Sequence, residues 1–315
     1  MCIRDRDNND GTYVATFTPQ VCGEHELSIT IENQPVKGGP FVLHVHQQRN
    51  YATSYQRVFG TSAHPYDVAV DDNGNVYVAA FNSHCIDVFN QQGTKIRTIG
   101  TPGSYGQGDG LFYSPAGIAI RGDVLYITEQ NNHRVQKITT SGKFISKFGS
   151  HGSGDGQLTS PRGICLDCDG RIFVSESSTN RVSVFEPNGA FAYHITTGNL
   201  NNPWGLAFDP TGNLHVSNYS SYLVSIFSPN GVYITNYNSQ VTYPAGITID
   251  EEGNSFIAEH HSTNASYNWS RFSVLDPNHQ LIRHIQGFRY ASGITFDKEG
   301  FIYVCSANTN QVYKY

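Results

Sequence analysis

A unit of roughly 40–50 residues recurs six times between residue 65 and the end of this 315-residue chain. Each copy begins with a proline or a small residue and continues into a branched apolar triplet. A glycine turn, a second apolar segment, a polar loop and a third segment follow. The copies start at Pro65, Pro115, Pro161, Pro203, Pro244 and Ala291. Because this period is typical of a four-stranded propeller blade, the repeat predicts an all-β chain dominated by a propeller.

The apolar pattern inside a unit predicts its strands. First segments such as residues 68–70 are apolar throughout, as expected for a strand buried on both sides, whereas third segments such as residues 182–184 alternate. Residues 95–100 follow a glycine turn and predict an outer fourth strand. The sixth unit ends at Tyr315 without a fourth strand, while residues 56–60 look like an outer strand without a blade. Pairing these two segments would close a ring of six blades and remove its exposed edges.

The start of the third segment carries a recognisable motif. Asn132-His133-Arg134-Val135 is the fullest copy, and residues 82–86 match it in kind. These units resemble NHL repeats, which are named for an Asn-His-Leu pattern at this place. The resemblance implies that residues 49–315 form a six-bladed NHL β-propeller. Residues 222–224 and 270–272 depart from the motif, so the loops of the fourth and fifth units need not behave like those of the family.

The segment before the repeats has a different signature. Asp10-Gly11-Thr12-Tyr13 leads into an alternating strand, and residues 23–31 and 38–45 add further strands. This order resembles the end of a filamin-type immunoglobulin-like β-sandwich, so residues 7–48 are interpreted as a partial repeat of that kind. About half of the ~100 residues of a complete sandwich are present. Residues 1–6 match nothing that follows and are interpreted as a non-native scar.

A filamin-type repeat directly before an NHL propeller is similar to the C-terminal half of tripartite-motif proteins. Those proteins carry RING, B-box and coiled-coil parts upstream. The resemblance implies a fragment of an E3 ubiquitin ligase in which this region recruits the protein substrate and the filamin-type piece is a spacer. We expect no enzymatic activity in these residues themselves, because they hold no series of cysteines and histidines that would bind the zinc of a RING domain.

Charge and cysteine content narrow the class of partner. The chain has 20 Lys and Arg residues against 26 Asp and Glu residues. Three of the basic and six of the acidic residues precede residue 49. The propeller therefore has 17 basic and 20 acidic residues, a net charge of −3. This balance argues against DNA binding and does not by itself indicate RNA binding. The six scattered cysteines favour reduced thiols in a cytoplasmic protein, and we interpret Cys165 and Cys168 as a core thiol beside a turn thiol. No apolar run reaches the ~20 residues of a membrane helix, so we expect no membrane partner. We also expect no cofactor.

A metal-dependent hydrolase or lyase is the catalytic alternative. Six-bladed propellers include lactonases and lyases that hold Ca²⁺ or Zn²⁺ near the central channel with carboxylates, Asn or His. The six innermost triplets of this chain contain neither His nor a carboxylate. Glu129, Glu176 and Glu259 lie at equivalent places just past the second strand and are the one set that could converge on the channel mouth. The competing interpretation is that they are solvated or paired with arginines, and we predict neither a catalytic nor a metal site.

Loops between the second and third strands, and linkers between blades, emerge on one face of a propeller, which we call the top face. The aromatic, histidine and arginine residues expected there are Tyr66, Phe81, His84, His133, Arg134, Arg162, Trp204, Tyr219, Tyr222, Tyr243, Trp269, Arg271, Arg289 and Tyr290. Such residues on a rigid surface suit protein hot spots or stacked bases. The NHL propellers that this one resembles divide between protein and RNA ligands. We therefore predict that the top face binds a protein substrate, with RNA as the alternative.

Overall fold

The computed structural model describes residues 2–7, 13–18, 23–27, 30–31, 34–35, 41–45, 56–238, 240–260 and 270–315. The chain divides into two compact units, Met1–Ala52 and Thr53–Tyr315, so the division falls slightly after the boundary expected between residues 48 and 49. Among the helices of the described residues, none is long and apolar enough to cross a membrane.

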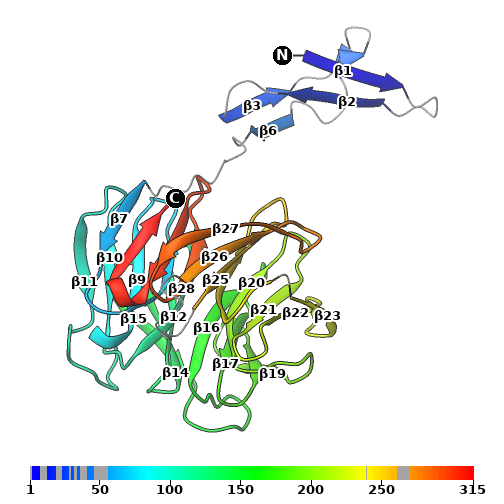
Figure 1. The fold of residues 1–315 in the computed structure, drawn as a ribbon. Helices are drawn as coiled ribbons and strands as arrows, with labels where there is room; N and C mark the ends of the chain where they lie inside the picture. The colour runs from blue at the N-terminus through cyan, green and yellow to red at the C-terminus, as the bar shows by residue number, and fades with distance from the viewer. Residues whose placement is uncertain are drawn as a thin grey trace. The chain divides into compact units, whose positions relative to one another are not determined.

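The second unit is a six-bladed β-propeller, which confirms the fold predicted from the repeat (Figure 1). Each blade is a four-stranded antiparallel sheet, and the first strand named for each blade is the innermost one. Blades 1 to 3 are β8 (Pro65–Val70), β9 (Val76–Ala80), β10 (Cys85–Phe89) and β11 (Lys95–Ile99); β12 (Pro115–Arg121), β13 (Val124–Glu129), β14 (Arg134–Thr139) and β15 (Phe144–Phe148); and β16 (Pro161–Leu166), β17 (Ile172–Glu176), β18 (Arg181–Phe185) and β19 (Phe191–Ile195). Blades 4 to 6 are β20 (Pro203–Phe208), β21 (Leu214–Asn218), β22 (Leu223–Phe227) and β23 (Tyr233–Tyr237); β24 (Pro244–Ile249), β25 (Ser255–Glu259), β26 (Ser270–Leu275) and β27 (Leu281–Phe288); and β28 (Ala291–Phe296), β29 (Ile302–Ser306), β30 (Gln311–Lys314) and β7 (Arg57–Gly60).

Blade 6 is completed by a strand from the other end of the unit. β7 pairs antiparallel with β30, with Phe59 opposite Val312. Phe59 is fully buried and meets the ring of Phe89 edge to face at 5.6 Å, so the closing strand also packs against blade 1. The ring closure expected from residues 56–60 is confirmed.

Adjacent blades pack through the Pro-x-Gly segment that starts most innermost strands. A Cβ atom on Gly163 would lie 2.1 Å from the Trp204 carbonyl oxygen of the next blade. Ser175 Oγ accepts the Gly163 N–H (2.9 Å) and donates to the same Trp204 oxygen (2.6 Å). Thr128 and Ser217 make equivalent pairs of bonds at two further junctions. Glycine is required at these positions because a side chain would push the two blades apart.

Blade 1 departs from this pattern, because Asp67 occupies the glycine position. Asp67 lies opposite Ala79, so this blade has no hydroxyl at the matching place on its second strand. The Asp67 carboxylate instead accepts the N–H groups of Val68 (2.9 Å) and of Ile118 in blade 2 (3.0 Å). On the other side, a Cβ atom on Gly293 of blade 6 would lie 2.3 Å from Asp67 Oδ1. The innermost triplet of blade 1, residues 68–70, holds no carboxylate, but Asp67 directly precedes it and belongs to the same strand, β8.

The aspartates that follow the innermost strands belong to turns. Asp71 Oδ1 accepts the N–H groups of Asn73 (2.9 Å) and Asn75 (2.8 Å). Asp209 and Asp250 accept backbone N–H groups in the same way. Each of these carboxylates thus stabilises its own turn by hydrogen bonds to the backbone.

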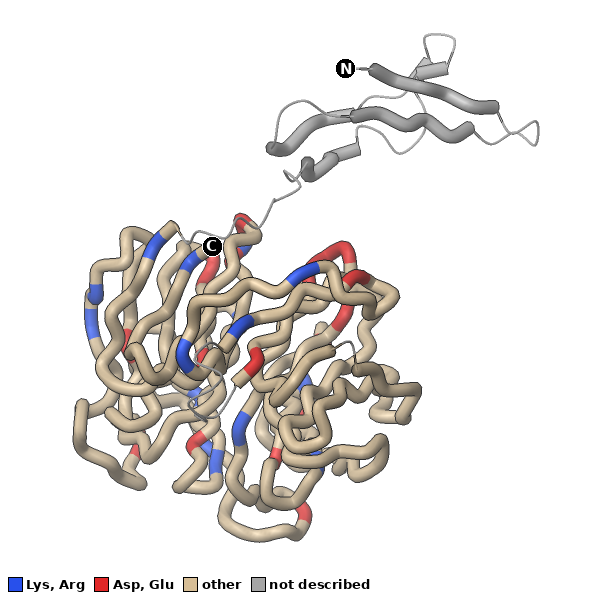
Figure 2. Tube along the Cα trace, viewed as in Figure 1, with Lys and Arg blue, Asp and Glu red and all other residues tan. Residues whose placement is uncertain are grey.

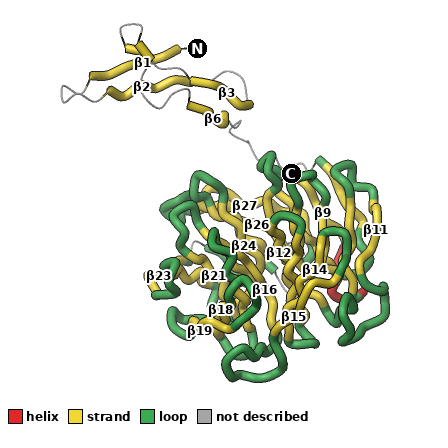
Figure 3. The backbone as a smooth tube through the Cα atoms, turned by 180° about the vertical axis from the view of Figure 1, so that it is seen from behind, coloured by secondary structure: helices red, strands yellow, loops and turns green. Residues whose placement is uncertain are grey.

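Helical structure in the described part of the propeller is confined to two short 3₁₀ turns, η1 (Phe81–Ser83) and η2 (Ala307–Thr309); strands and loops make up the remainder (Figure 3). The core lies between blades. Between blades 1 and 2, for example, Tyr77, Ile86, Phe112 and Ile127 form one buried cluster. Each blade thus buries both faces of its sheet against its neighbours, which explains why segments such as residues 76–80 are apolar throughout.

The first unit contains β1 (Cys2–Asp7), β2 (Tyr13–Thr18), β3 (Gly23–Leu27), β4 (Thr30–Ile31), β5 (Gln34–Pro35) and β6 (Phe41–Val45). The antiparallel pairs are β1 with β2, β3 with β6, and β4 with β5. Residues 2–6, which were interpreted as part of a non-native scar, form most of β1.

Candidate ligand-binding face

Five rings form a connected group across the mouth of the central channel. Tyr66 of blade 1 stacks on Trp204 of blade 4 with ring centroids 5.2 Å apart, and Phe81 stacks on the far side of this pair, 4.6 Å from Tyr66. Tyr219 and His260 lie 5.2 Å from Trp204. We call this group the aromatic bridge. Because blades 1 and 4 are opposite one another in a ring of six, the aromatic bridge spans the channel at the top face.

Arg162 of blade 3 lies against the aromatic bridge. Its guanidinium carbon is 4.0 Å from the Trp204 ring centroid, and Nη1 donates a 3.0 Å hydrogen bond to the Tyr66 hydroxyl. Burial raises the pKa of the Tyr66 phenol, an effect that the charge of Arg162 partly opposes. Arg162 Nε is buried without a hydrogen-bond partner within the described residues. The sequence predicts both Arg162 and Trp204 on the top face, and the structure brings them into direct contact.

More aromatic side chains continue outward over blades 4 to 6. Tyr243 lies 5.3 Å from Tyr219 and 4.7 Å from Tyr222, and Tyr290 lies 4.5 Å from His260. A hydrogen bond with Tyr243 raises the pKa of the Tyr222 phenol. These partly exposed tyrosines extend the aromatic bridge, in which Tyr66 and Trp204 are themselves buried, with 9% and 7% of their surface exposed. His260 was not among the predicted site residues, because two adjacent histidines in a polar loop gave no positional signal.

The histidines of the repeat motif have a structural role at the blade junctions. His84 and His133 adopt left-handed backbone conformations, with φ of 57° and 53°. Their Nδ1 atoms accept the N–H groups of Ser114 and Ser160 at the start of the next blade, both at 3.1 Å. Asn180 Oδ1 does the same for the next junction. Burial lowers the pKa of both histidines, which favours the neutral acceptor form.

His84 also borders a second aromatic group at the junction of blades 1 and 2. Tyr105 stacks on Tyr113 at 4.5 Å, and His84 meets both rings edge to face. Tyr105 is 64% exposed, the most exposed of the aromatic residues on this surface that the structure describes. Its ring contacts are with His84 and Tyr113 and not with the aromatic bridge.

Two of the predicted arginines are engaged in ion pairs rather than free for a ligand. Arg134 Nε lies 2.5 Å from Glu129 Oε1, and Arg271 Nε lies 2.9 Å from Glu259 Oε1. Arg134 Nη1 and Nη2 also donate to three linker carbonyl oxygens. Arg289 differs, because it is exposed at the start of blade 6. Trp269 lies outside the described residues.

The three glutamates considered as a metal set are each paired within their own blade. Glu176, like Glu129 and Glu259, bonds an arginine: Arg181 Nε at 2.7 Å. Each glutamate also accepts a backbone N–H from the preceding linker, at Tyr113, Thr159 and Thr242. Within residues 56–238, 240–260 and 270–315, no three His, Cys, Asp or Glu residues come together to hold a metal ion. The three glutamates are therefore paired with arginines, as the competing interpretation of the sequence had it.

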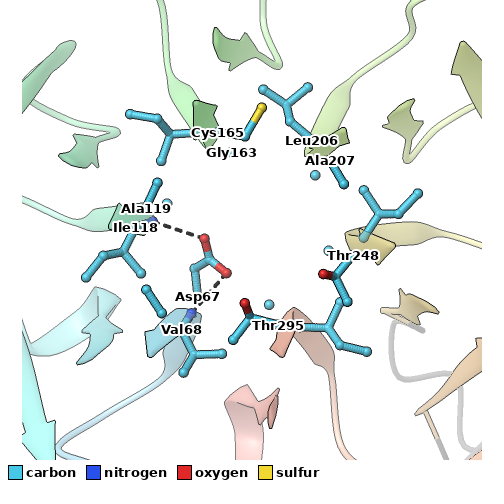
Figure 4. A pocket seen from close by; sticks show the side chains of 18 of the residues that line it. Asp67, Val68, Ile118, Ala119, Gly163, Cys165, Leu206, Ala207, Thr248 and Thr295 are labelled. Carbon is cyan, nitrogen blue, oxygen red and sulfur yellow. Dashed lines mark hydrogen bonds between the residues drawn. The ribbon is translucent and has the colours of Figure 1, made fainter. Parts of the chain in front are cut away.

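Below the aromatic bridge the channel has a volume of about 590 Å³. Its wall comes from the six innermost strands and extends to the turn residues Asp167 and Cys168. Figure 4 shows Asp67 pointing toward the middle of this channel, with its hydrogen bonds to the backbone of Val68 and Ile118. Burial raises the pKa of Asp67 to about 7, against the opposing effect of these two bonds. The signal for Asp67 was present in the sequence, as the one Asp where other units have glycine.

Charged residues of both signs are spread over the propeller among mostly uncharged residues (Figure 2).

The two units of the chain match models of different protein families. Residues 3–42 match the model of the Filamin/ABP280 repeat, a range that includes residues 3–6 of β1. Residues 112–138 and 158–185 match the model of the NHL repeat. These two matches fall on blades 2 and 3, where the motif reads most clearly. The propeller is thus similar to NHL-repeat propellers, through the repeats of these two blades.

Among curated proteins, the E3 ubiquitin-protein ligase TRIM71 of Rattus norvegicus is 33% identical over 97 residues, which are 28% of this chain and 11% of that protein. Protein brain tumor of Drosophila melanogaster is 28% identical over 133 residues, 41% of this chain and 12% of that protein. The matched stretch is thus a small part of the length of these relatives. With its filamin-type match, the NHL propeller resembles the C-terminal half of tripartite-motif proteins.

Two solved structures show the same fold in unrelated settings. A gluconolactonase from Xanthomonas campestris superimposes with a TM-score of 0.64 at 16% identity, over 82% of this chain and 88% of that one. A virginiamycin B lyase from Staphylococcus aureus gives 0.58 at 16% identity, over 82% and 97%. At this identity the likeness concerns the propeller fold and not the activity.

Proposed function

We propose that the NHL propeller is a macromolecular binding platform, and that its top face recruits the protein substrate of a tripartite-motif-type E3 ubiquitin ligase. The observation that carries this proposal is the aromatic bridge and its extension through Tyr222, Tyr243 and Tyr290. Rigid, partly exposed aromatic side chains supply large contact area at low entropic cost, and they dominate protein hot spots.

The similarity to TRIM71, an E3 ubiquitin-protein ligase, supports the ligase context. The match covers 11% of that protein, so the ligase activity itself is proposed for a longer protein and not for these residues. The ion pairs of Glu129, Glu176 and Glu259 also favour a binding module over a metal-dependent enzyme, because the carboxylates that could have held a metal are already neutralised.

RNA is the second candidate, and one observation favours it. The Arg162 guanidinium on the Trp204 ring lies next to other open rings, and base stacking on such rings is worth about 1–3 kcal/mol per base. The charge balance of −3 for the propeller works against it, because neutralised phosphates supply most of the affinity for RNA.

Affinity capture from cells with the tagged full chain tests the proposal. The informative variants are Tyr222→Ala and Arg289→Glu on the top face. Tyr233→Ala is the matched control, because it removes a tyrosine of the same blade from the outer strand β23. We expect the top-face variants to lose a defined set of proteins by roughly fivefold or more, the loss typical of a hot-spot residue, while Tyr233→Ala keeps them.

Treatment with ribonuclease separates the two candidate ligands. Proteins that stay bound after ribonuclease support protein recruitment. Capture that disappears with ribonuclease, together with selective enrichment from a randomised RNA pool, would replace it with the RNA function. Equal capture by all three variants would show that the ligand does not use the top face.

A further inference from the structure

The channel below the aromatic bridge has the shape of a small-molecule site. Its volume of about 590 Å³ falls within the usual range of ligand pockets. Small side chains leave the axis open at one level of the wall, where Figure 4 shows Ala119, Cys165, Ala207, Thr248 and Thr295 around the channel. The aromatic bridge blocks the top, so a ligand would enter from the face that carries the turns.

Two carboxylates line the described wall of this channel: Asp167 is paired with Arg171 at 2.6 Å, whereas Asp67 has no ion pair. Arg121 also lines the wall and donates to the carbonyl oxygens of Asp167 and Cys168. Asp67 accepts two backbone N–H groups, and no salt bridge to it is found in the described part of the propeller. Arg162, the cation at the closed end, directs its guanidinium to Tyr66 and Trp204 instead. An enclosed carboxylate of this kind is stabilised when a cation joins it.

We propose that the channel binds a small organic ammonium ion, with the Asp67 carboxylate as its counter-ion. The apolar wall, with Val70, Ile120 and Phe208 among its residues, would cover an alkyl body. The Thr248 and Thr295 hydroxyls lie in the same wall and can accept further N–H bonds. This inference goes beyond the proposed function, because it concerns the channel and not the top face.

A bare metal ion fits the channel less well than an organic cation. Among the described residues, no three His, Cys, Asp or Glu side chains come together to hold a metal ion, and both Asp67 oxygens already accept a backbone N–H. The binding energy of an organic ammonium comes from burying its apolar part as well as from its charge.

The pH dependence follows from Asp67 and from its neighbours. Burial raises the pKa of the Cys305 thiol and of the Tyr66 phenol, so both stay neutral near pH 7. Burial also raises the pKa of the Cys165 thiol, so this group too stays neutral near pH 7. Asp67 is then the group that titrates between pH 6 and 8. With a pKa of about 7, its ionised fraction rises about tenfold over that interval, and affinity for a cation rises with it.

Ligand-observed saturation-transfer NMR with the full chain and n-butylammonium chloride tests the site. Butan-1-ol and sodium chloride are the controls for the alkyl body and for ionic strength. We expect a saturable signal on the butyl methyl protons that strengthens about tenfold from pH 6 to pH 8. Asp67→Asn should weaken binding at pH 8 at least tenfold, and Thr295→Leu should do so by filling the channel while Asp67 stays in place.

The two variants keep the proposal falsifiable if one of them folds poorly, which circular dichroism will show. A response that never saturates would overturn the proposal, as would equal binding of butan-1-ol. Competition by sodium at equal concentration would assign the site to an inorganic cation instead. Unchanged binding in a folded Asp67→Asn protein would remove Asp67 from the site.

Discussion

The buried ion pair of blade 2 allows a quantitative prediction. Glu129 has no exposed surface, and its carboxylate accepts hydrogen bonds from Arg134 Nε (2.5 Å), Gln136 Nε2 (2.8 Å), Asn132 Nδ2 (2.6 Å) and Tyr113 N (2.9 Å). The substitution Arg134→Met keeps the aliphatic stem but removes the cation. The carboxylate would then stay buried with neutral donors only.

Removing one partner of a buried ion pair costs about 3–5 kcal/mol, because the other charge is left without compensation. The carbonyl oxygens of Gln107, Gly108 and Leu111 lose their donors in the same variant, which places the expected cost in the upper half of that range. For a domain of this size, 1 kcal/mol shifts the melting temperature by roughly 2–4 °C. We therefore expect a decrease of about 8–20 °C.

Urea unfolding followed by circular dichroism measures the free energy directly. The double variant Arg134→Met, Glu129→Gln should recover at least about 2 kcal/mol, because no charge remains buried. Lys147→Met is the matched control, since Lys147 forms a comparable pair with Asp109 at 2.8 Å in which both side chains are about half exposed. That control should cost less than about 1 kcal/mol. A single variant within 1 kcal/mol of the parent, or a double variant no more stable than the single, would refute the reasoning.

Three further outcomes follow from the packing of the ring. Gly163→Ala should lower the free energy of unfolding by about 1–3 kcal/mol or more, because its Cβ would meet a backbone carbonyl oxygen at 2.1 Å; a melting temperature equal to that of the parent would contradict this. Removing residues 1–60 deletes β7 and should unfold or aggregate the propeller, whereas removing residues 1–52 should leave its urea midpoint unchanged. In urea titrations, the free energy of unfolding of Asp67→Asn minus that of the parent should rise by about 2–3 kcal/mol between pH 5 and pH 8. The sign follows because Asp67 has a folded pKa of about 7, above the unfolded value, so the parent loses stability as pH rises toward 7. A difference that does not change with pH would show that Asp67 is not perturbed.

The blades and their closure could be predicted because each depends on a pattern that repeats. Six copies of one period fix the number of blades, and the unmatched strand at residues 56–60 could pair only with the unmatched third strand at the end. The outline of the top face could be predicted for the same reason, since loops at equivalent places in a repeat emerge on the same side.

The contacts of individual side chains depend on register, which the repeat pattern alone does not give. Glu129 lies directly opposite Arg134, and Glu176 opposite Arg181, across a tight turn of constant length. A Glu five residues before an Arg in two units was the available signal that these arginines are engaged. Asp67 was missed because the triplets were read from the residue after it, although its replacement of glycine was visible.

The closing strand has a consequence for synthesis in the cell. β7 is the first strand of the propeller to leave the ribosome, but its partner β30 follows about 250 residues later. At roughly 5–20 residues per second, β7 waits about 12–50 s with its edge unpaired. During that interval the nascent chain offers a template for pairing with other chains, so a chaperone that shields residues 57–60 would raise the yield of closed rings.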